Sequence, residues 1–198
     1  LAELETTLKR YESITPDMLR ENYRYFLSKV IPVCEECGVR MGCHPDDPAW
    51  PIFGLPRIAH SQEDFDKIVA LYDSPANGIC LCTGSLGSEP NNNIPEIIRH
   101  FGSMNRIARL HGRNVKHLGY RKFREAPHLS REGDLDMYAI MKAIYDTCPD
   151  TYIRPDHGRH LWNEGPGNVR PGYGLYDRAL GIMYMLGVWD SLEKFDNK

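Results

Sequence analysis

Five residues of the kinds that bind divalent cations follow short apolar segments of the sequence. They are His44, Cys82, His111 and the adjacent pair Asp156 and His157. Nitrogen, sulfur and oxygen donors together suit borderline cations such as Zn²⁺, Fe²⁺, Co²⁺ or Mn²⁺ better than Ca²⁺ or Mg²⁺. Taken singly, each residue has an ordinary structural explanation: a hydrogen-bonding loop histidine, a small buried cysteine or a capping aspartate. Their recurrence after four segments favours one metal centre with a position left open for substrate.

The apolar segments before these residues are typical of buried strands, and they alternate with helical patterns. We expect strands at residues 39–43, 78–82, 106–111 and 151–154. The first helix is expected at 16–37, with Thr15 as N-cap and Pro16 in the first turn. It should end at Gly38, and Pro32 should kink it. Further helices are expected after the caps Ser61, Asn93 and Asp134 and within residues 175–192.

This order, a helix followed by four β-α units, predicts an α/β fold with parallel strands. A Rossmann domain requires a glycine-rich turn after its first strand, and none follows Cys43. We therefore predict a (βα)₈ TIM barrel, of which residues 1–198 form a single domain that supplies about the last four βα units. In such a barrel the chemistry lies at the carboxyl ends of the strands, where the five residues fall.

Composition excludes several classes of function. The net charge of −3 gives no general attraction to nucleic acid or anionic membranes, and no apolar run approaches the ~18–20 residues that span a bilayer. Six cysteines in 198 residues are too sparse for a disulfide scaffold. We therefore expect a cytoplasmic protein without membrane or nucleic-acid partners.

Two local patterns point elsewhere and carry less weight. Cys34 and Cys37, followed by Cys43, could suggest a zinc ribbon, but the first two fall on the apolar face of the first helix. Strand alternation should place Cys80 on the same side as Cys82, and Cys43 on the other. Residues 106–124 hold seven Lys or Arg and no acid; we interpret them as a cationic active-site loop for an anionic substrate.

Several long segments resemble mannonate dehydratases, a family whose barrel is similar to that of xylose isomerase. They are HPDDPAWPIFGLPRI (44–58), CTGSLGSEP (82–90), LHGRNV (110–115), HLSREGDLDMYAIMKAI (128–144), and RPDHGRHLW followed by RPGYGLYDRALG (154–181). The family's chains are roughly twice this length. The resemblance implies a lyase that removes water from D-mannonate to give 2-keto-3-deoxy-D-gluconate in hexuronate breakdown. It also implies a small-molecule sugar acid as partner and a homo-oligomer, a dimer.

The resemblance also assigns roles to residues. It implies Mn²⁺, or a similar ion such as Fe²⁺ or Co²⁺, held by His44, Cys82, His111 and Asp156. It implies His157 and Tyr173 as the acid–base residues, with their division of labour open.

Two points have alternatives: the role of the arginines near these positions, and the identity of the reaction. Arg113 and Arg159 could bind the substrate carboxylate by bidentate hydrogen bonds, or be solvated loop residues. Asp46 and Asp47 are expected to orient a ligand or a sugar hydroxyl, or to serve as caps, rather than to act directly in catalysis. The alternative functions are a metal-dependent sugar isomerase or epimerase on the same barrel, and a non-catalytic metal- or nucleic-acid-binding module.

Overall fold

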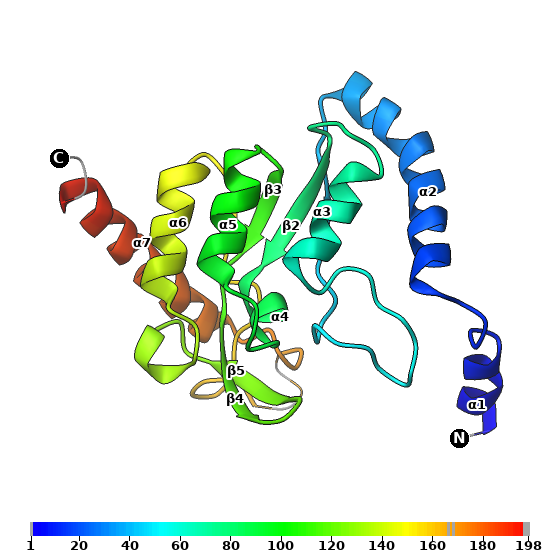
Figure 1. Ribbon diagram of the computed structural model, residues 1–198. Coiled ribbons are helices and arrows are strands. Elements are labelled where there is room, and N and C mark those ends of the chain that lie inside the picture. The colour runs from blue at the N-terminus through cyan, green and yellow to red at the C-terminus, as the bar shows by residue number, and fades with distance from the viewer. Residues whose placement is uncertain (1, 166, 168, 196–198) are drawn as a thin grey trace.

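The computed structural model describes residues 2–165, 167 and 169–195 (Figure 1). The α-helices are α1 (Ala2–Lys9), α2 (Pro16–Cys37), α3 (Gln62–Ala70), α4 (Thr83–Gly87), α5 (Ile94–Ser103), α6 (Met137–Thr147) and α7 (Leu175–Phe195). The strands are β1 (Met41–Cys43), β2 (Asn77–Cys82), β3 (Ile107–His111), β4 (Asn114–Gly119), β5 (Lys122–Ala126) and β6 (Ile153–Arg154), and a 3₁₀ turn, η1, covers Ser130–Glu132. None of the helices in this described part is long and apolar enough to cross a membrane.

The central sheet has four parallel strands in the order β1-β2-β3-β6. From one edge of the sheet to the other, the strands therefore follow the order in which they occur along the chain, and this order does not reverse. A doubly wound sheet has such a reversal, whereas successive strands of a (βα) barrel do not. The α/β class and the parallel sheet are as predicted, and the strand order is that of a partial barrel.

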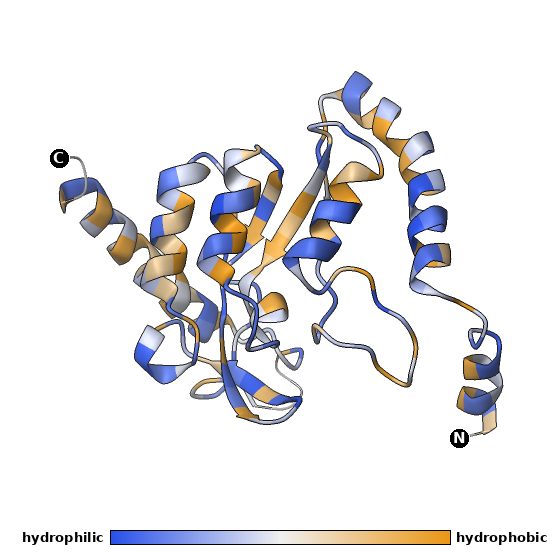
Figure 2. Cartoon of the chain, in the orientation of Figure 1, coloured by the Kyte–Doolittle hydropathy of each residue, from blue (hydrophilic) through white to orange (hydrophobic). Residues whose placement is uncertain are grey.

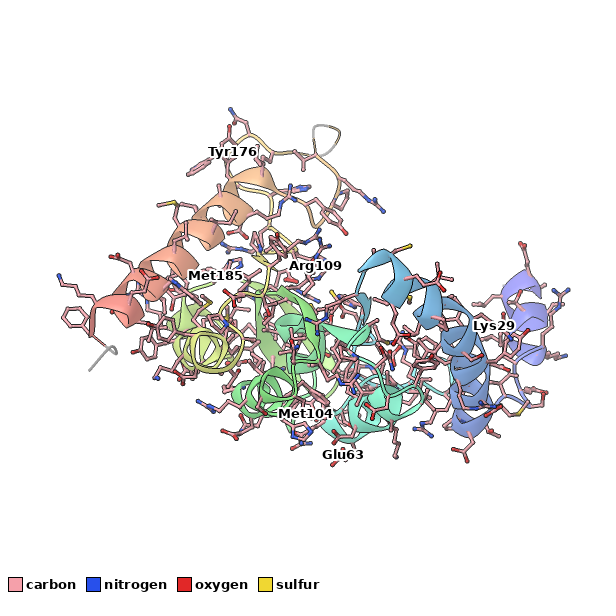
Figure 3. All side chains as sticks on the ribbon, turned by 90° about the horizontal axis from the view of Figure 1, so that it is seen from above. Lys29, Glu63, Met104, Arg109, Tyr176 and Met185 are labelled. Carbon is pink, nitrogen blue, oxygen red and sulfur yellow. The ribbon has the colours of Figure 1, made fainter. Side chains whose placement is uncertain are left out.

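One face of the sheet carries the helices α3, α5 and α6 (Figures 1 and 3). Their apolar sides pack on β2 and β3 and form the main core, in which Phe65, Phe101, Ile98, Leu81 and Leu110 are fully buried. The hydropathy colouring shows that the outward sides of these helices carry polar residues (Figure 2). The opposite face is open to solvent at Arg109 on β3, which is exposed and lies on the side of the sheet away from these three helices (Figure 3).

The predicted helix caps and the predicted end of α2 form as expected, with one correction. Thr15, Ser61 and Asn93 each accept a backbone hydrogen bond at the start of α2, α3 and α5, and Gly38 ends α2 at φ 64°. The prediction of Asp134 as the cap of α6 is wrong. Asp136 accepts from Ala139 N (3.0 Å), because Asp134 instead accepts hydrogen bonds from Lys116 Nζ and His117 N.

The elements that were not predicted are α1, the short helix α4, the 3₁₀ turn η1, and the antiparallel hairpin of β4 and β5. The hairpin corrects our interpretation of residues 106–124 as one cationic loop. Arg106 lies at the opposite end of the sheet and pairs with Asp73, while Lys116 pairs with Asp134. Arg106, Arg113 and Lys116, three of the seven basic residues, are therefore paired with carboxylates of the fold.

Candidate metal centre and active site

Four side chains from the carboxyl ends of the four parallel strands meet at one point. His44 follows β1, Cys82 ends β2, His111 ends β3, and Asp156 follows β6. One donor atom of each lies within 4.8 Å of the donors of the other three. His44 is exposed and the other three are buried, so the cluster has one open side. The register that aligns Cys82 with His111 and His111 with Arg154 brings these ends level.

The chemistry of this donor set fits a divalent cation. His44 Nδ1 lies 2.8 Å from the carbonyl oxygen of Pro45, so an Nδ1–H donates there and leaves Nε2 for the cluster. His111 Nδ1 is buried and has no hydrogen-bond partner among the described residues, with Asp156 Oδ1 3.5 Å away. A buried nitrogen without a partner costs free energy, and a cation bound by these donors would supply the missing interaction.

The Cys82 thiol is set up to ionise. Burial raises its pKa, but hydrogen bonds with His111 and His44 and the charge of Arg113 outweigh burial and lower the pKa to about 5. Its sulfur lies 3.9 Å from Asp156 Oδ2. Hydrogen bonding and ion pairing also lower the pKa of Asp156, against its own burial. Two buried anionic donors side by side favour a positive ion between them.

The backbone at Asp156 is in an uncommon conformation. Its φ is +58°, a left-handed value that aspartate tolerates better than most residues. The residue leaves β6 at this point, and Arg154 Nη2 donates to Asp156 Oδ1 (2.6 Å). Such backbone strain concentrates at functional sites.

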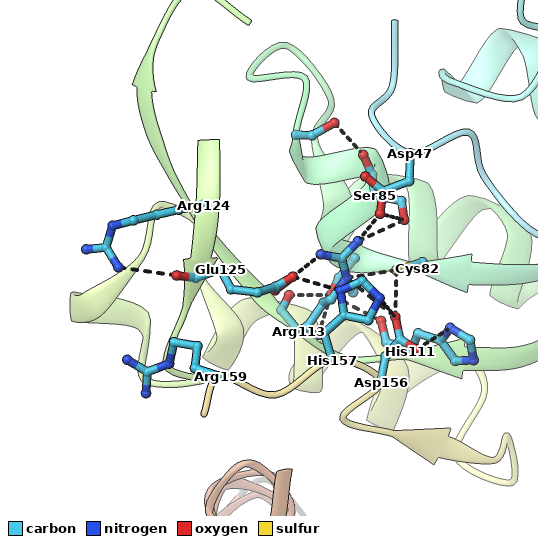
Figure 4. Close-up of polar contacts among 12 residues, drawn as sticks. Asp47, Cys82, Ser85, His111, Arg113, Arg124, Glu125, Asp156, His157 and Arg159 are labelled. Atoms are coloured by element: carbon cyan, nitrogen blue, oxygen red, sulfur yellow. Dashed lines mark hydrogen bonds and ion pairs between the residues drawn. The ribbon is translucent and has the colours of Figure 1, made fainter. Parts of the chain in front are cut away.

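Arg113, which follows β3, lies beside the cluster and contacts protein groups from several segments. Its Nη2 donates to Asp47 and to Ser85 Oγ (3.1 Å), and its Nε to Cys82 Sγ (3.4 Å). Its Nη1 donates to Glu125 (Figure 4). The guanidinium lies so close to Gly84 that a Cβ there would be 2.6 Å from Arg113 Cγ.

His157 and Tyr173 lie next to each other beside the cluster. Their rings are 5.6 Å apart, edge to face, because a backbone bridge joins Gly158 to Tyr173. His157 Nε2 is 3.6 Å from Asp156 Oδ2. A hydrogen bond to Glu125 outweighs burial and raises the pKa of His157. Both groups are half-buried and can therefore exchange protons with a molecule bound at the open side.

Arg159 is not brought into the cluster. Its Nε and Nη2 donate to the two oxygens of Asp177 (2.9 and 2.8 Å), and its side chain points away from the other residues in Figure 4. The binding of a substrate carboxylate by Arg113 and Arg159 stays a prediction.

Glu125 and Ser85 were not predicted as residues of the site. Glu125 comes from the unpredicted hairpin and Ser85 from the unpredicted helix α4. Asp47 was expected to orient a ligand, and it accepts from Arg113 and from Ser85 Oγ (3.1 Å). The alternation of Val115, His117, Phe123 and Glu125 around Gly119 was the one available signal for the hairpin.

Comparison with known proteins gives a consistent result. The chain is 71% identical over 194 residues to a mannonate dehydratase of Lachnoclostridium phytofermentans, covering 98% of this chain and 53% of that protein. It is 52% identical to the mannonate dehydratase of Lactococcus lactis subsp. lactis, covering 98% of this chain and 54% of that protein. The chain spans about half the length of the curated relatives it matches.

Solved structures agree. A crystal structure of mannonate dehydratase from Streptococcus suis matches with a TM-score of 0.93 at 41% identity, covering 100% of this chain and 56% of that chain. A D-tagatose 3-epimerase-like protein matches with a TM-score of 0.65 at 13% identity, covering 89% of this chain and 57% of that one, which shows a shared fold alone. The family described as D-mannonate dehydratase (UxuA) matches residues 1–198, and this chain belongs to that family.

Proposed function

We propose that the full-length protein containing this chain is a lyase that converts D-mannonate into 2-keto-3-deoxy-D-gluconate and water. The observation that carries this proposal is the meeting of two imidazoles, a thiol and a carboxylate at four strand ends, beside a His–Tyr pair, in a chain of the mannonate dehydratase family. The same likeness favours a role in hexuronate breakdown in the cytoplasm, and a homodimer.

The residues that would hold the cation are His44, Cys82, His111 and Asp156. Mn²⁺ is the ion we propose, and Fe²⁺ or Co²⁺ would suit the same donors. When bound, the cation supplies Lewis-acid stabilisation of negative charge that develops on the substrate oxygens. The open side at His44 leaves room for those oxygens.

His157 and Tyr173 would carry the two proton transfers. One takes the proton from C2 of the substrate, and the other gives a proton to the C3 hydroxyl, which leaves as water when the C3–O bond breaks. The resulting enol takes up a proton at C3 while its C2 hydroxyl gives up a proton, and it becomes the 2-keto acid, so one water is lost in total. His157 suits either task near neutral pH. Of the two predicted carboxylate-binding arginines, Arg113 lies within the cluster, but the groups it contacts favour a role in holding the site together.

We also propose that residues 1–198 form about the last four βα units of a (βα)₈ barrel. The sequential parallel strand order supports this. The open face of the sheet, where Arg109 is exposed, and relatives of about twice the length support it as well. The remaining strands would cover that face.

Mass spectrometry of the product tests the function. The full-length protein, supplied with Mn²⁺ and D-mannonate, should form a product lighter by one water. In deuterated water the product should also carry deuterium at C3. The isomerase or epimerase alternative leaves the substrate mass unchanged, and a non-catalytic module leaves the substrate unconsumed.

The variant His157→Gln should lower kcat by about 10²–10⁴-fold, the usual contribution of a general acid or base. Arg124→Ala, an exposed change on strand β5, is the control and should keep wild-type activity. Wild-type turnover of mannonate by His157→Gln would contradict the assigned role.

A further inference from the structure

Glu125 lies on strand β5, outside the parallel sheet, and its carboxylate reaches into the site. One oxygen, Oε1, accepts hydrogen bonds from Arg113 Nη1 and from His157 Nδ1, the second at 3.1 Å (Figure 4). This single carboxylate oxygen thus links Glu125 to Arg113 and to His157, which lie in two other segments of the chain.

This contact decides which nitrogen of His157 is available for chemistry. A carboxylate that is paired with Arg113 only accepts hydrogen bonds, so the neutral ring keeps its hydrogen on Nδ1. The lone pair is then on Nε2, the nitrogen that lies 3.6 Å from Asp156 Oδ2 and faces the metal-ligand cluster. We propose that Glu125 is a positioning residue that fixes the orientation and tautomer of His157. This inference rests on the proposed function of the site.

The base of the hairpin holds Glu125 firmly. Its cross-strand partner Val115 is fully buried. Asn114, paired with Ala126, is also fully buried and accepts a hydrogen bond from Leu135 N (3.1 Å). Arg113, 2% exposed, holds the carboxylate from the other side. An orienting group must itself be fixed in this way if it is to fix a catalytic side chain.

Steady-state kinetics of the full-length protein test the role. Glu125→Ala should lower kcat by about 10–100-fold, as is typical when a group that orients a site residue is lost. The KM for D-mannonate and the bound metal should stay within twofold of wild type. Glu125→Gln should recover most of the lost kcat, because its amide oxygen can accept from Nδ1–H. Glu132→Ala, which removes an exposed carboxylate from η1, should match wild type.

Three outcomes would overturn the proposal. They are a wild-type kcat in Glu125→Ala, a loss of kcat that parallels loss of metal, and a Glu125→Gln variant no more active than Glu125→Ala. If the alanine variant fails to fold, the comparison of Glu125→Gln with wild type still decides, because a large fall in its kcat contradicts the proposal.

A spectroscopic measurement separates this inference from the proposed reaction. Nitrogen-15 NMR of histidine-labelled protein loaded with diamagnetic Zn²⁺ reports the tautomer of His157, assigned with His157→Gln. We expect the hydrogen on Nδ1 in wild type and its loss from Nδ1 in Glu125→Ala. An Nε2–H tautomer in wild type refutes the positioning role. A protein with the expected tautomer that does not consume mannonate refutes the reaction alone.

Discussion

Phe101 on α5 and Cys82 at the end of β2 are both completely buried, in surroundings of opposite kind. Phe101 packs edge to face on Phe65 in the layer between helices and sheet. Cys82 is surrounded by two histidines, an arginine and an aspartate. Burial in the helical layer stabilises the fold, since it removes apolar surface from water. Burial at the strand ends costs free energy unless each polar group has a partner. The partner that suits these donors is a cation.

The largest effect should come from removing a donor at the strand ends. Cys82→Ala should weaken metal binding by more than about 100-fold, beyond the loss typical of residues that only contact the ligands, and leave the protein folded. Metal titration followed by calorimetry measures this. Cys37→Ala, an exposed cysteine on α2, is the control. Unchanged affinity in Cys82→Ala would remove Cys82 from the ligand set.

A change in the helical layer should lower the stability of the fold and leave metal binding unchanged. Phe101→Ala should lower the free energy of unfolding by about 3–5 kcal/mol, the usual cost of truncating a buried phenylalanine. The metal bound per folded molecule should stay at the wild-type value. Chemical denaturation measures the first and elemental analysis the second, with the exposed Met104→Ala as control. A Phe101→Ala protein that stays stable but loses its metal would contradict the view that the helical layer determines stability and the strand ends determine metal binding.

A smaller effect should appear in how the free energy of unfolding of the metal-free protein depends on pH. The pKa of Cys82 falls from 9.0 to about 5 on folding, so between these values the unfolded chain holds a proton that the folded chain has released. Stability should therefore rise with pH across this window and be lost as pH falls through about 5, at up to about 1.4 kcal/mol per pH unit. Denaturation at several pH values should show a weaker rise in Cys82→Ala. An identical rise in the two proteins would mean that the thiol does not ionise on folding.

The same contrast explains which features could be predicted from sequence. The strands and helices of the main layer were predictable because Phe65, Ile68 and Ile98 follow the helical period and caps such as Ser61 and Asn93 have local partners. The strand-end positions of His44, Cys82, His111 and Asp156 were predictable because parallel strands end on one edge.

The contacts of Glu125 and Arg113 were not predictable. They depend on a hairpin whose strands carry mostly polar residues and on a short helix of small residues, and neither has a strong periodic pattern. The misplaced cap has a similar cause: Asp134 and Asp136 are both suitable N-caps in sequence. Only the tertiary contact of Asp134 with the hairpin decides between them.

The sequential strand order has a consequence for protein engineering. Because the strands follow one another across the sheet in the order of the chain, the four clustered donor residues lie within one segment, residues 44–156. A circular permutation, or a chimaera that joins residues 1–198 to βα units of another protein, would carry all four donor residues together as long as its new junctions fall outside that segment.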